Sequence, residues 1–214
     1  MSIKSETQGF DLSGKSAVIV GCGGLGTNAA AHLCGMGVGR LCLVDGDTVE
    51  ARNLNRQFFY TPEDVGRPKS ELLAARLAAY APDCVLTGVR QFISVADDLS
   101  DFRGTDVIIA AVDHLAARRL LNDFCKESGV PLVNGGIHGF FGTAYAYLPG
   151  RTPDLAQAGL LAAENPSPVS VSSTVGVIGA LQAQLAAQLL CGDTQCAGKL
   201  YVFDNSEIHS LQIQ

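Results

Sequence analysis

A glycine-rich motif near the start of the chain has the residue types and spacing of a phosphate-binding turn. Gly21-Cys-Gly-Gly-Leu-Gly26 follows the apolar run 16–20 and precedes an Ala- and Leu-rich segment, so a strand, a tight turn and a helix are expected. Glycines let the backbone approach a phosphate, and a helix N-terminus stabilises its charge. The residues expected to contact a nucleotide here are Gly21, Gly23, Gly24, Leu25 and Gly26.

Asp45 follows the next apolar run, 40–44, roughly 20 positions after the glycines. An acidic side chain at the end of this second strand can accept hydrogen bonds from ribose hydroxyls. NAD, FAD and ATP all carry that ribose. The glycine motif and Asp45 together therefore leave an NAD-dependent oxidoreductase open as an alternative.

The segment 45–57, D-G-D-T-V-E-A-R-N-L-N-R-Q, followed by Gly66-Arg-Pro-Lys69, narrows the choice. It resembles the ThiF/MoeB/HesA family and the adenylation domains of ubiquitin-activating enzymes, whose signature is D-x-D-x-V-x-x-x-N-L-x-R-Q followed by V-G-x-P-K. The resemblance continues at 111–113, 131–135 and 175–183 and in the final strand, so it covers nearly the whole chain.

This resemblance implies an ATP-dependent adenylyltransferase, a nucleotidyltransferase that activates the C-terminal glycine carboxylate of a small ubiquitin-like sulfur-carrier protein of the ThiS/MoaD type, ending in Gly-Gly. The products are an acyl adenylate and pyrophosphate. Both reactants are anions, so the site needs cations and amide donors. A non-catalytic, nucleotide-binding subunit of an activating-enzyme heterodimer is a further alternative, although such subunits generally lose the phosphate-binding cluster.

By the resemblance, Arg56 and Lys69 hold the triphosphate, and Asn53 donates a hydrogen bond to a phosphate oxygen. Asp113 holds Mg²⁺, and Gln57 supports the same cluster. These residue types suit the chemistry, since Mg²⁺ bridges phosphate oxygens and prefers carboxylate ligands.

Asp47 is expected either to bind near the metal or to shape the turn. Lys69 and Arg56 have the alternative role of solvated surface cations. The alternative role of Asn53 is that of a turn residue. The alternative role of Asp113 is that of an N-cap for a helix beginning at His114. We assign His114 itself a structural role, because the attacking carboxylate is already ionised at neutral pH and needs no general base.

Strands alternate with helices in the first half of the chain, which predicts an α/β, Rossmann-like, mostly parallel sheet with helices on both faces. From Gly135 onward, strand-like segments predict an antiparallel far edge. We expect one adenylation domain, 1–214. The predicted strands are 16–20, 40–44, 84–92, 106–110, 130–134, 143–148 and 199–203, and the predicted helices are 27–36, 68–80, 114–128 and 173–190.

A formal net charge of -6 argues against nucleic acid as a partner. The polar stretch 1–9 lacks the apolar core of a secretory signal, and the seven cysteines show no pairing pattern, so we expect reduced thiols and a cytoplasmic protein. The most apolar segment, 175–191, contains glutamines and is short for a bilayer span. It predicts a buried helix and a homodimer rather than a membrane protein.

The chain departs from the family at three places. It has no C-x-x-C pair, so no structural zinc is expected. The family's loop cysteine is absent from the stretch 164–173, which leaves Cys191 and Cys196 as the thiols expected to be accessible. An arginine-rich opening that supplies a trans-acting arginine is not recognisable in 1–12. The acyl adenylate could pass to a sulfurtransferase, to an internal thiol or to an amine.

Overall fold

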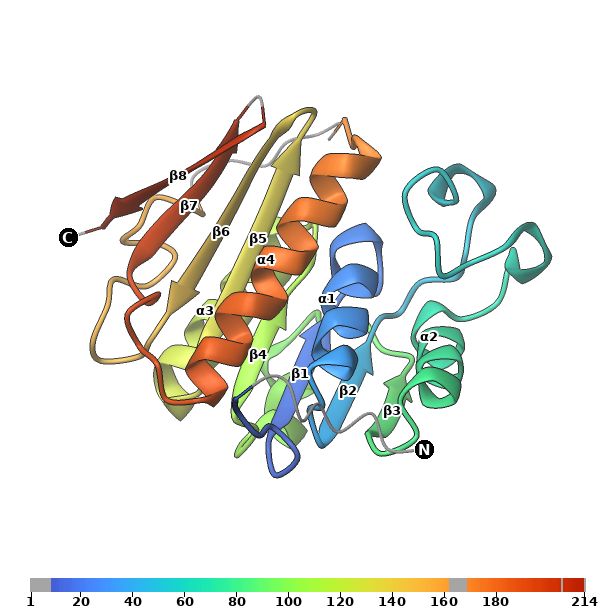
Figure 1. The fold of residues 1–214 in the computed structure, drawn as a ribbon, viewed down its shortest axis with the longest axis horizontal. Coiled ribbons are helices and arrows are strands. Elements are labelled where there is room, and N and C mark those ends of the chain that lie inside the picture. Colours follow the sequence, from blue (N-terminus) through green and yellow to red (C-terminus); the bar gives the residue numbers. More distant parts are fainter. Residues whose placement is uncertain (1–8, 162–168, 205, 214) are drawn as a thin grey trace.

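The computed structural model describes residues 9–161, 169–204 and 206–213. One eight-stranded sheet runs through it, in the order β3-β2-β1-β4-β5-β6-β7-β8 (Figure 1). Neighbouring strands from β3 to β5 are parallel, and those from β5 to β8 are antiparallel. The strands are β1 Ser16–Val20, β2 Arg40–Val44, β3 Val85–Val89, β4 Val107–Ala110, β5 Leu132–His138, β6 Phe141–Tyr147, β7 Lys199–Asp204 and β8 Glu207–Gln212.

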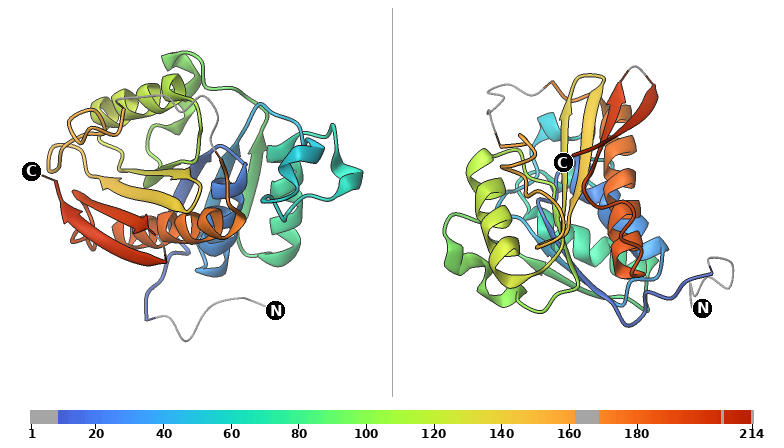
Figure 2. Two further views of the ribbon diagram at one scale, coloured as in Figure 1. Left: turned by 90° about the horizontal axis from the view of Figure 1, so that it is seen from above. Right: turned by 90° about the vertical axis from the view of Figure 1, so that its left-hand side faces the viewer.

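Four α-helices cover the two faces of this sheet: α1 Gly24–Gly35, α2 Lys69–Tyr80, α3 Leu115–Ser128 and α4 Ser172–Leu190. Figure 2 shows α1, α2 and α4 on one face and α3 on the other. The buried side chains accordingly form one large cluster on each face. The predicted α/β architecture, with helices on both faces and an antiparallel far edge, is confirmed.

The central strands are apolar along their whole length because helices cover them on both faces. In β4, Val-Ile-Ile-Ala, every residue is buried, and four of the five residues of β1 are buried. Strands β2, β1 and β4 are neighbours in this buried part of the sheet, so their C-terminal ends have fixed positions. The loops that follow those ends form the candidate site.

Helix α4 packs closely against α1, and the two run side by side in Figure 1. A Cβ on Gly179 would lie 2.8 Å from the Leu25 carbonyl oxygen and 2.6 Å from the Cβ of Asn28, so only glycine allows this approach. By length and composition, α4 could also cross a membrane, but 56% of its most apolar window is buried inside the protein. That burial is the pattern of the core helix that the sequence predicts.

Several details differ from the sequence prediction. Strand β3 ends at Val89 rather than at residue 92, and β5 continues to His138 rather than ending at residue 134. Helix α1 begins at Gly24 rather than at residue 27, because the last glycines of the motif already form its first turn. Strand β8 was not predicted, since all six of its residues are exposed and give no burial pattern. The segment between the predicted strand 143–148 and the predicted helix 173–190 forms turns as far as residue 161, with Leu155 buried, and its residues 162–168 lie outside the described residues.

Two glycines on α4 provide a matched test of the packing with α1. Gly179→Ala should lower the free energy of unfolding by about 1–3 kcal/mol, because the new methyl group overlaps the backbone of α1. Gly176→Ala should raise it by about 0.5–1 kcal/mol, since a Cβ there meets nothing within 4 Å and alanine favours the helix. Urea unfolding measures both, and equal effects of the two substitutions would contradict this packing.

Candidate nucleotide-binding site

The glycine turn is built where the ends of three parallel strands meet. The Gly21 amide donates to the Val44 carbonyl at 2.8 Å, and the Ala111 amide donates to the Val20 carbonyl at 2.8 Å. Gly21 has φ +97°, and a Cβ on it would collide with the Ala111 carbonyl. A Cβ on Gly26 would likewise collide with the Gly21 carbonyl. Both glycines are therefore required by close backbone approach.

Asp45, at the end of β2, holds this turn from the side. Its Oδ2 accepts a hydrogen bond from the Cys22 amide at 2.6 Å, and its Oδ1 accepts one from the Asp47 amide at 2.8 Å. Burial raises the pKa of the Asp45 carboxyl, and these two amide hydrogen bonds offset part of that rise. Asp45 thus lies beside the glycine turn, as predicted, and also fixes its backbone.

Lys69, the first residue of α2, is a buried cation at the same edge of the sheet. Its side chain is only 7% exposed, and its Nζ lies 3.1 Å from Asp47 Oδ2. The Lys69 amide also donates to the Asp47 carbonyl at 3.1 Å. A solvated surface role for Lys69 is therefore wrong, and the structure pairs Asp47 with Lys69. A buried ammonium with one exposed carboxylate partner is suited to binding a further anion.

Residues 45–68, which we call the crossing segment, connect β2 to α2 and project from the sheet at the upper right of Figure 1. The base is closed by two backbone hydrogen bonds: the Val49 amide donates to the Arg67 carbonyl at 2.9 Å, and the Gly66 amide donates to the Val49 carbonyl at 2.8 Å. Inside it, Asn53 is buried and its Oδ1 accepts from the Glu50 amide at 3.3 Å. Asn53 therefore shapes a turn here.

The crossing segment places Arg56 and Gln57 differently. The Arg56 guanidinium is half-exposed and donates to the Asn55 side chain at 3.0 Å, while its carbonyl oxygen would lie 3.3 Å from a Cβ on Gly24. Gln57 is buried against Gly23, and its Oε1 has no hydrogen-bond partner among the described residues. The segment thus packs on the glycine turn through Gln57, with the Arg56 side chain outside.

A buried carboxylate, Asp64, holds the crossing segment to α2. Its Oδ2 accepts hydrogen bonds from the Thr61 amide at 2.7 Å and from Arg76 Nη2 at 2.6 Å, and Arg76 also donates to the Phe59 carbonyl. Burial alone would raise the pKa of Asp64, but these hydrogen bonds outweigh it and lower that pKa. The ion pair with Arg67, at 3.2 Å, is more exposed.

Asp113 lies in the loop that follows β4, beyond Ala111. Its side chain is 76% exposed and lies 3.6 Å from His114 Nε2. The N-cap of α3 is His114, so the N-cap role for Asp113 is wrong. Arg118 braces this loop by donating to the Val112 carbonyl at 2.8 Å, and burial lowers the pKa of its guanidinium.

The exposed carboxylate of Asp113 is a suitable ligand for Mg²⁺. This ion usually keeps several waters and takes one or two carboxylates plus phosphate oxygens. The described residues contain no cluster of three or more His, Cys, Asp or Glu side chains arranged for a metal. A single exposed carboxylate such as that of Asp113 fits a metal that arrives with a phosphate ligand. No contact in the described part of the chain joins Asp113 to Lys69 or to Arg56.

Comparison with known protein families shows the family of this chain. The sequence matches the ThiF family over residues 3–214. The chain belongs to the ThiF family. This confirms the resemblance seen in the signature at 45–57 and 66–69.

Named relatives of this ThiF-family chain are adenylyltransferases and activating enzymes. It is 36% identical over 213 residues to the sulfur carrier protein ThiS adenylyltransferase of Escherichia coli, covering 95% of this chain and 84% of that protein. It is 35% identical over 215 residues to the SAMP-activating enzyme E1 of Haloferax volcanii, covering 93% and 76%. The predicted nucleotidyltransferase class is confirmed by these relatives.

The fold is also shared with E. coli MccB, solved with ATP, at a TM-score of 0.83 and 23% identity. The match covers 94% of this chain and 64% of that one, so the ThiF-family chain spans less than two thirds of MccB. At this identity, the likeness shows the fold.

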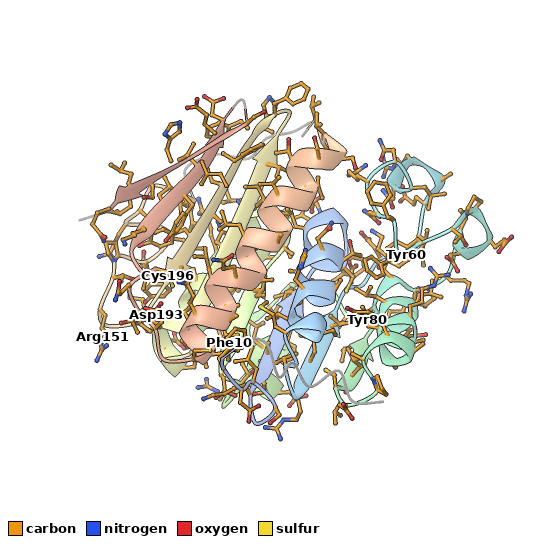
Figure 3. All side chains as sticks on the ribbon, viewed as in Figure 1. Phe10, Tyr60, Tyr80, Arg151, Asp193 and Cys196 are labelled. Atoms are coloured by element: carbon orange, nitrogen blue, oxygen red, sulfur yellow. The ribbon has the colours of Figure 1, made fainter. Side chains whose placement is uncertain are left out.

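Sequence reasoning was wrong about one thiol. Cys191 is exposed, as expected, but Cys196 is 2% exposed and burial raises its pKa to about 11. Figure 3 shows Cys196 on the side of the molecule away from the crossing segment. Sequence reasoning also missed Tyr60, Asp64 and Arg118. Tyr60 and Arg118 donate to backbone carbonyls, which leave no residue pattern in the sequence. Asp64 forms a capping box with Thr61, and that T-x-x-D spacing is a signal that could have indicated the turn.

The two arginines that share Asp64 provide a test of what holds the crossing segment. Arg76→Met should lower the free energy of unfolding at pH 7 by about 1–3 kcal/mol, because it removes the closest cation from a buried carboxylate, which keeps only the more exposed ion pair with Arg67 and its hydrogen bonds from Thr61. Arg67→Met, at the more exposed pair, should cost about 0–1 kcal/mol.

The pKa of Asp64 is lowered in the folded state, so its stabilisation is present above the unfolded pKa and is lost as the pH falls through the folded one. The deficit of Arg76→Met should therefore shrink below about pH 4. Urea unfolding over a pH series measures this, and a deficit that stays constant in acid would show that Asp64 is not its source.

Proposed function

We propose that this chain is an ATP- and Mg²⁺-dependent adenylyltransferase for the C-terminal glycine carboxylate of a small ubiquitin-like sulfur-carrier protein. The observation that carries the proposal is the buried Lys69 ammonium at the strand-end edge, in a chain of the ThiF family that also keeps the glycine turn. In this proposal residues 1–214 act as one adenylation domain.

The site supports this function better than the two alternatives. An NAD-dependent oxidoreductase would account for the glycine turn and Asp45 but gives no reason to bury Lys69 against Asp47. A non-catalytic subunit would have no need to keep the signature residues Asn53, Arg56 and Lys69 together. A reaction between two anions requires such cations and amide donors.

The reaction forms one bond and breaks one. A carboxylate oxygen of the carrier attacks the α-phosphorus of ATP, the bond from that phosphorus to the α,β-bridging oxygen breaks, and pyrophosphate leaves with the electron pair. Lys69 and Arg56 would neutralise charge on the triphosphate, which for Arg56 requires its guanidinium to give up its hydrogen bond to the Asn55 side chain. Asn53 would donate to a phosphate oxygen.

Asp113 is the carboxylate proposed to hold Mg²⁺, which supplies positive charge between phosphate oxygens when it is bound. Arg118 fixes the loop that carries Asp113 through the Val112 carbonyl. The first-turn amides of α1, which have no partners within the helix, complete the anion site together with the glycine turn.

The proposed partners follow from the family and the surface. The named relatives act on sulfur-carrier and related proteins, and some are fused to a sulfurtransferase, so both kinds of protein are proposed partners here. A homodimer is proposed because α4 leaves several apolar side chains, including Val177 and Leu181, only partly buried. The proposed location is the cytoplasm.

The first test is ATP–pyrophosphate exchange in the presence of a candidate carrier. Lys69→Ala should lower the exchange rate by about 10²–10³-fold, because it removes a preorganised cation from the transition state. Asp113→Ala should have an effect of similar size.

Lys126→Ala is the matched control. Lys126 lies on α3, its side chain is 62% exposed, and it pairs with Asp154. Exchange should be unchanged in that variant. Near-normal exchange in both Lys69→Ala and Asp113→Ala would overturn the site assignment.

The second test concerns a covalent thiol step. We expect adenylation without an obligatory thioester or persulfide link to the carrier, because such a link needs a thiolate and the stretch 164–173, where the family carries its loop cysteine, contains none. Cys191 is exposed and Cys196 is buried, so Cys196→Ala should have no effect on any adduct. Non-reducing intact-mass analysis of enzyme, carrier, ATP and Mg²⁺ measures this. An adduct lost in Cys191→Ala, together with lost transfer activity, would show that a relocated thiol is required.

A further inference from the structure

Tyr60 connects the crossing segment to the glycine turn. It lies at the base of the segment, on the side of α1 and α2 (Figure 3), and is 4% exposed. Its hydroxyl oxygen is 2.8 Å from the Cys22 carbonyl oxygen and 3.3 Å from the Lys69 carbonyl oxygen. A hydroxyl has one proton to donate, so the shorter contact is the principal hydrogen bond.

With this hydrogen bond, both backbone groups of Cys22 have a partner. The Cys22 amide donates to Asp45 Oδ2 at 2.6 Å, and the Cys22 carbonyl accepts from Tyr60. Burial raises the pKa of the Tyr60 phenol, so the hydroxyl stays protonated and remains a donor at physiological pH.

The orientation of the next amide follows from peptide geometry. A trans peptide is planar, and its C=O and N–H point in opposite directions. Tyr60 draws the Cys22 carbonyl towards the crossing segment, so the Gly23 N–H points away from Tyr60. Gly23 is the N-cap of α1, with φ −78° and ψ −153°. A glycine there can adopt positive φ at little cost, so its own backbone preference does not hold this peptide and the Tyr60 hydrogen bond contributes to fixing it.

We propose that Tyr60 is a positioning residue whose hydroxyl holds the Cys22–Gly23 peptide with the Gly23 N–H directed at a nucleotide phosphate. The proposal rests on the proposed binding of ATP. Without the hydroxyl, the peptide is free to rotate and to present the Cys22 carbonyl oxygen to the phosphate in place of a donor. The phosphate would then face the Cys22 carbonyl oxygen, which repels it, instead of the Gly23 N–H, which attracts it. This change would occur at the N-terminus of α1, where the anion is proposed to bind.

The test compares two buried tyrosines that each donate to a backbone carbonyl. Tyr145 donates to the Pro153 carbonyl at 2.7 Å, on the opposite face of the sheet, so Tyr145→Phe is the matched control for Tyr60→Phe. Calorimetry would measure the dissociation constants of Mg²⁺–ATP and of adenosine for both variants. Urea midpoints would confirm that both remain folded.

Tyr60→Phe should weaken ATP binding by roughly tenfold or more, the effect of losing one hydrogen bond to a charged group, and change adenosine binding less than about twofold. Tyr145→Phe should change neither. In glycine-¹⁵N-labelled protein, ATP should shift the Gly23 amide proton downfield, and Tyr60→Phe should remove that shift.

Equal losses of ATP and adenosine affinity in Tyr60→Phe would show a purely structural role and overturn the proposal. An ATP affinity of Tyr60→Phe equal to that of the wild type would overturn it as well. If the wild type itself binds ATP no more tightly than adenosine, the proposed function fails together with this inference. If the wild type prefers ATP and Tyr60→Phe retains that preference, only the role of Tyr60 fails.

Discussion

The close approach of β1 and β4 at Gly21 is the constraint on which the rest of the site depends. The peptide after Gly21 can turn into α1 only because no Cβ separates it from the Ala111 carbonyl. This contact sets the distance between the glycine turn, at the end of β1, and the loop that carries Asp113, at the end of β4. The two halves of the proposed site therefore share one rigid base.

The charged side chains at the strand-end edge of the sheet differ in their exposure to solvent. Lys69 is buried, whereas its partner Asp47 and the more distant Asp113 are both exposed. An anion entering from solvent would reach a helix N-terminus and a buried ammonium, with carboxylates on the outer side where a divalent cation could bind them. The crossing segment closes over one side of the turn through Gln57 and is anchored to α2 by Asp64.

The fold was predictable because the sequence patterns that indicate its strands and helices each lie within a short segment. Buried parallel strands such as β4 are continuous apolar runs, and the glycine motif shows where a strand ends and a helix begins. Strand β8 could not be predicted, since a fully exposed edge strand takes its shape from pairing with β7 rather than from burial. The burial of Cys196 was missed because it depends on how the turn after α4 folds back onto that helix, which brings the Cys196 thiol to 3.9 Å from the Leu185 carbonyl.

The candidate site was predictable in composition but not in geometry. The spacing of Asp45, Asn53 and Lys69 indicated a nucleotide site. It could not show that Lys69 pairs with Asp47, or that the Arg56 side chain lies outside the turn. Those arrangements come from the closed base of the crossing segment, between Val49 and residues 66–67, and from its contacts with Gly23 and Gly24, all of which join residues far apart in the sequence.

The measurement that tests the central claim most directly follows oxygen atoms through the reaction. A carrier labelled with ¹⁸O in its C-terminal carboxylate is incubated with the protein, ATP, Mg²⁺ and an acceptor nucleophile, and the nucleotide product is analysed by mass spectrometry. Attack of the carboxylate on the α-phosphorus places one labelled oxygen in AMP when the acyl adenylate is later cleaved at carbon, and this is the predicted result. Unlabelled AMP, or labelled phosphate accompanied by ADP, would contradict it.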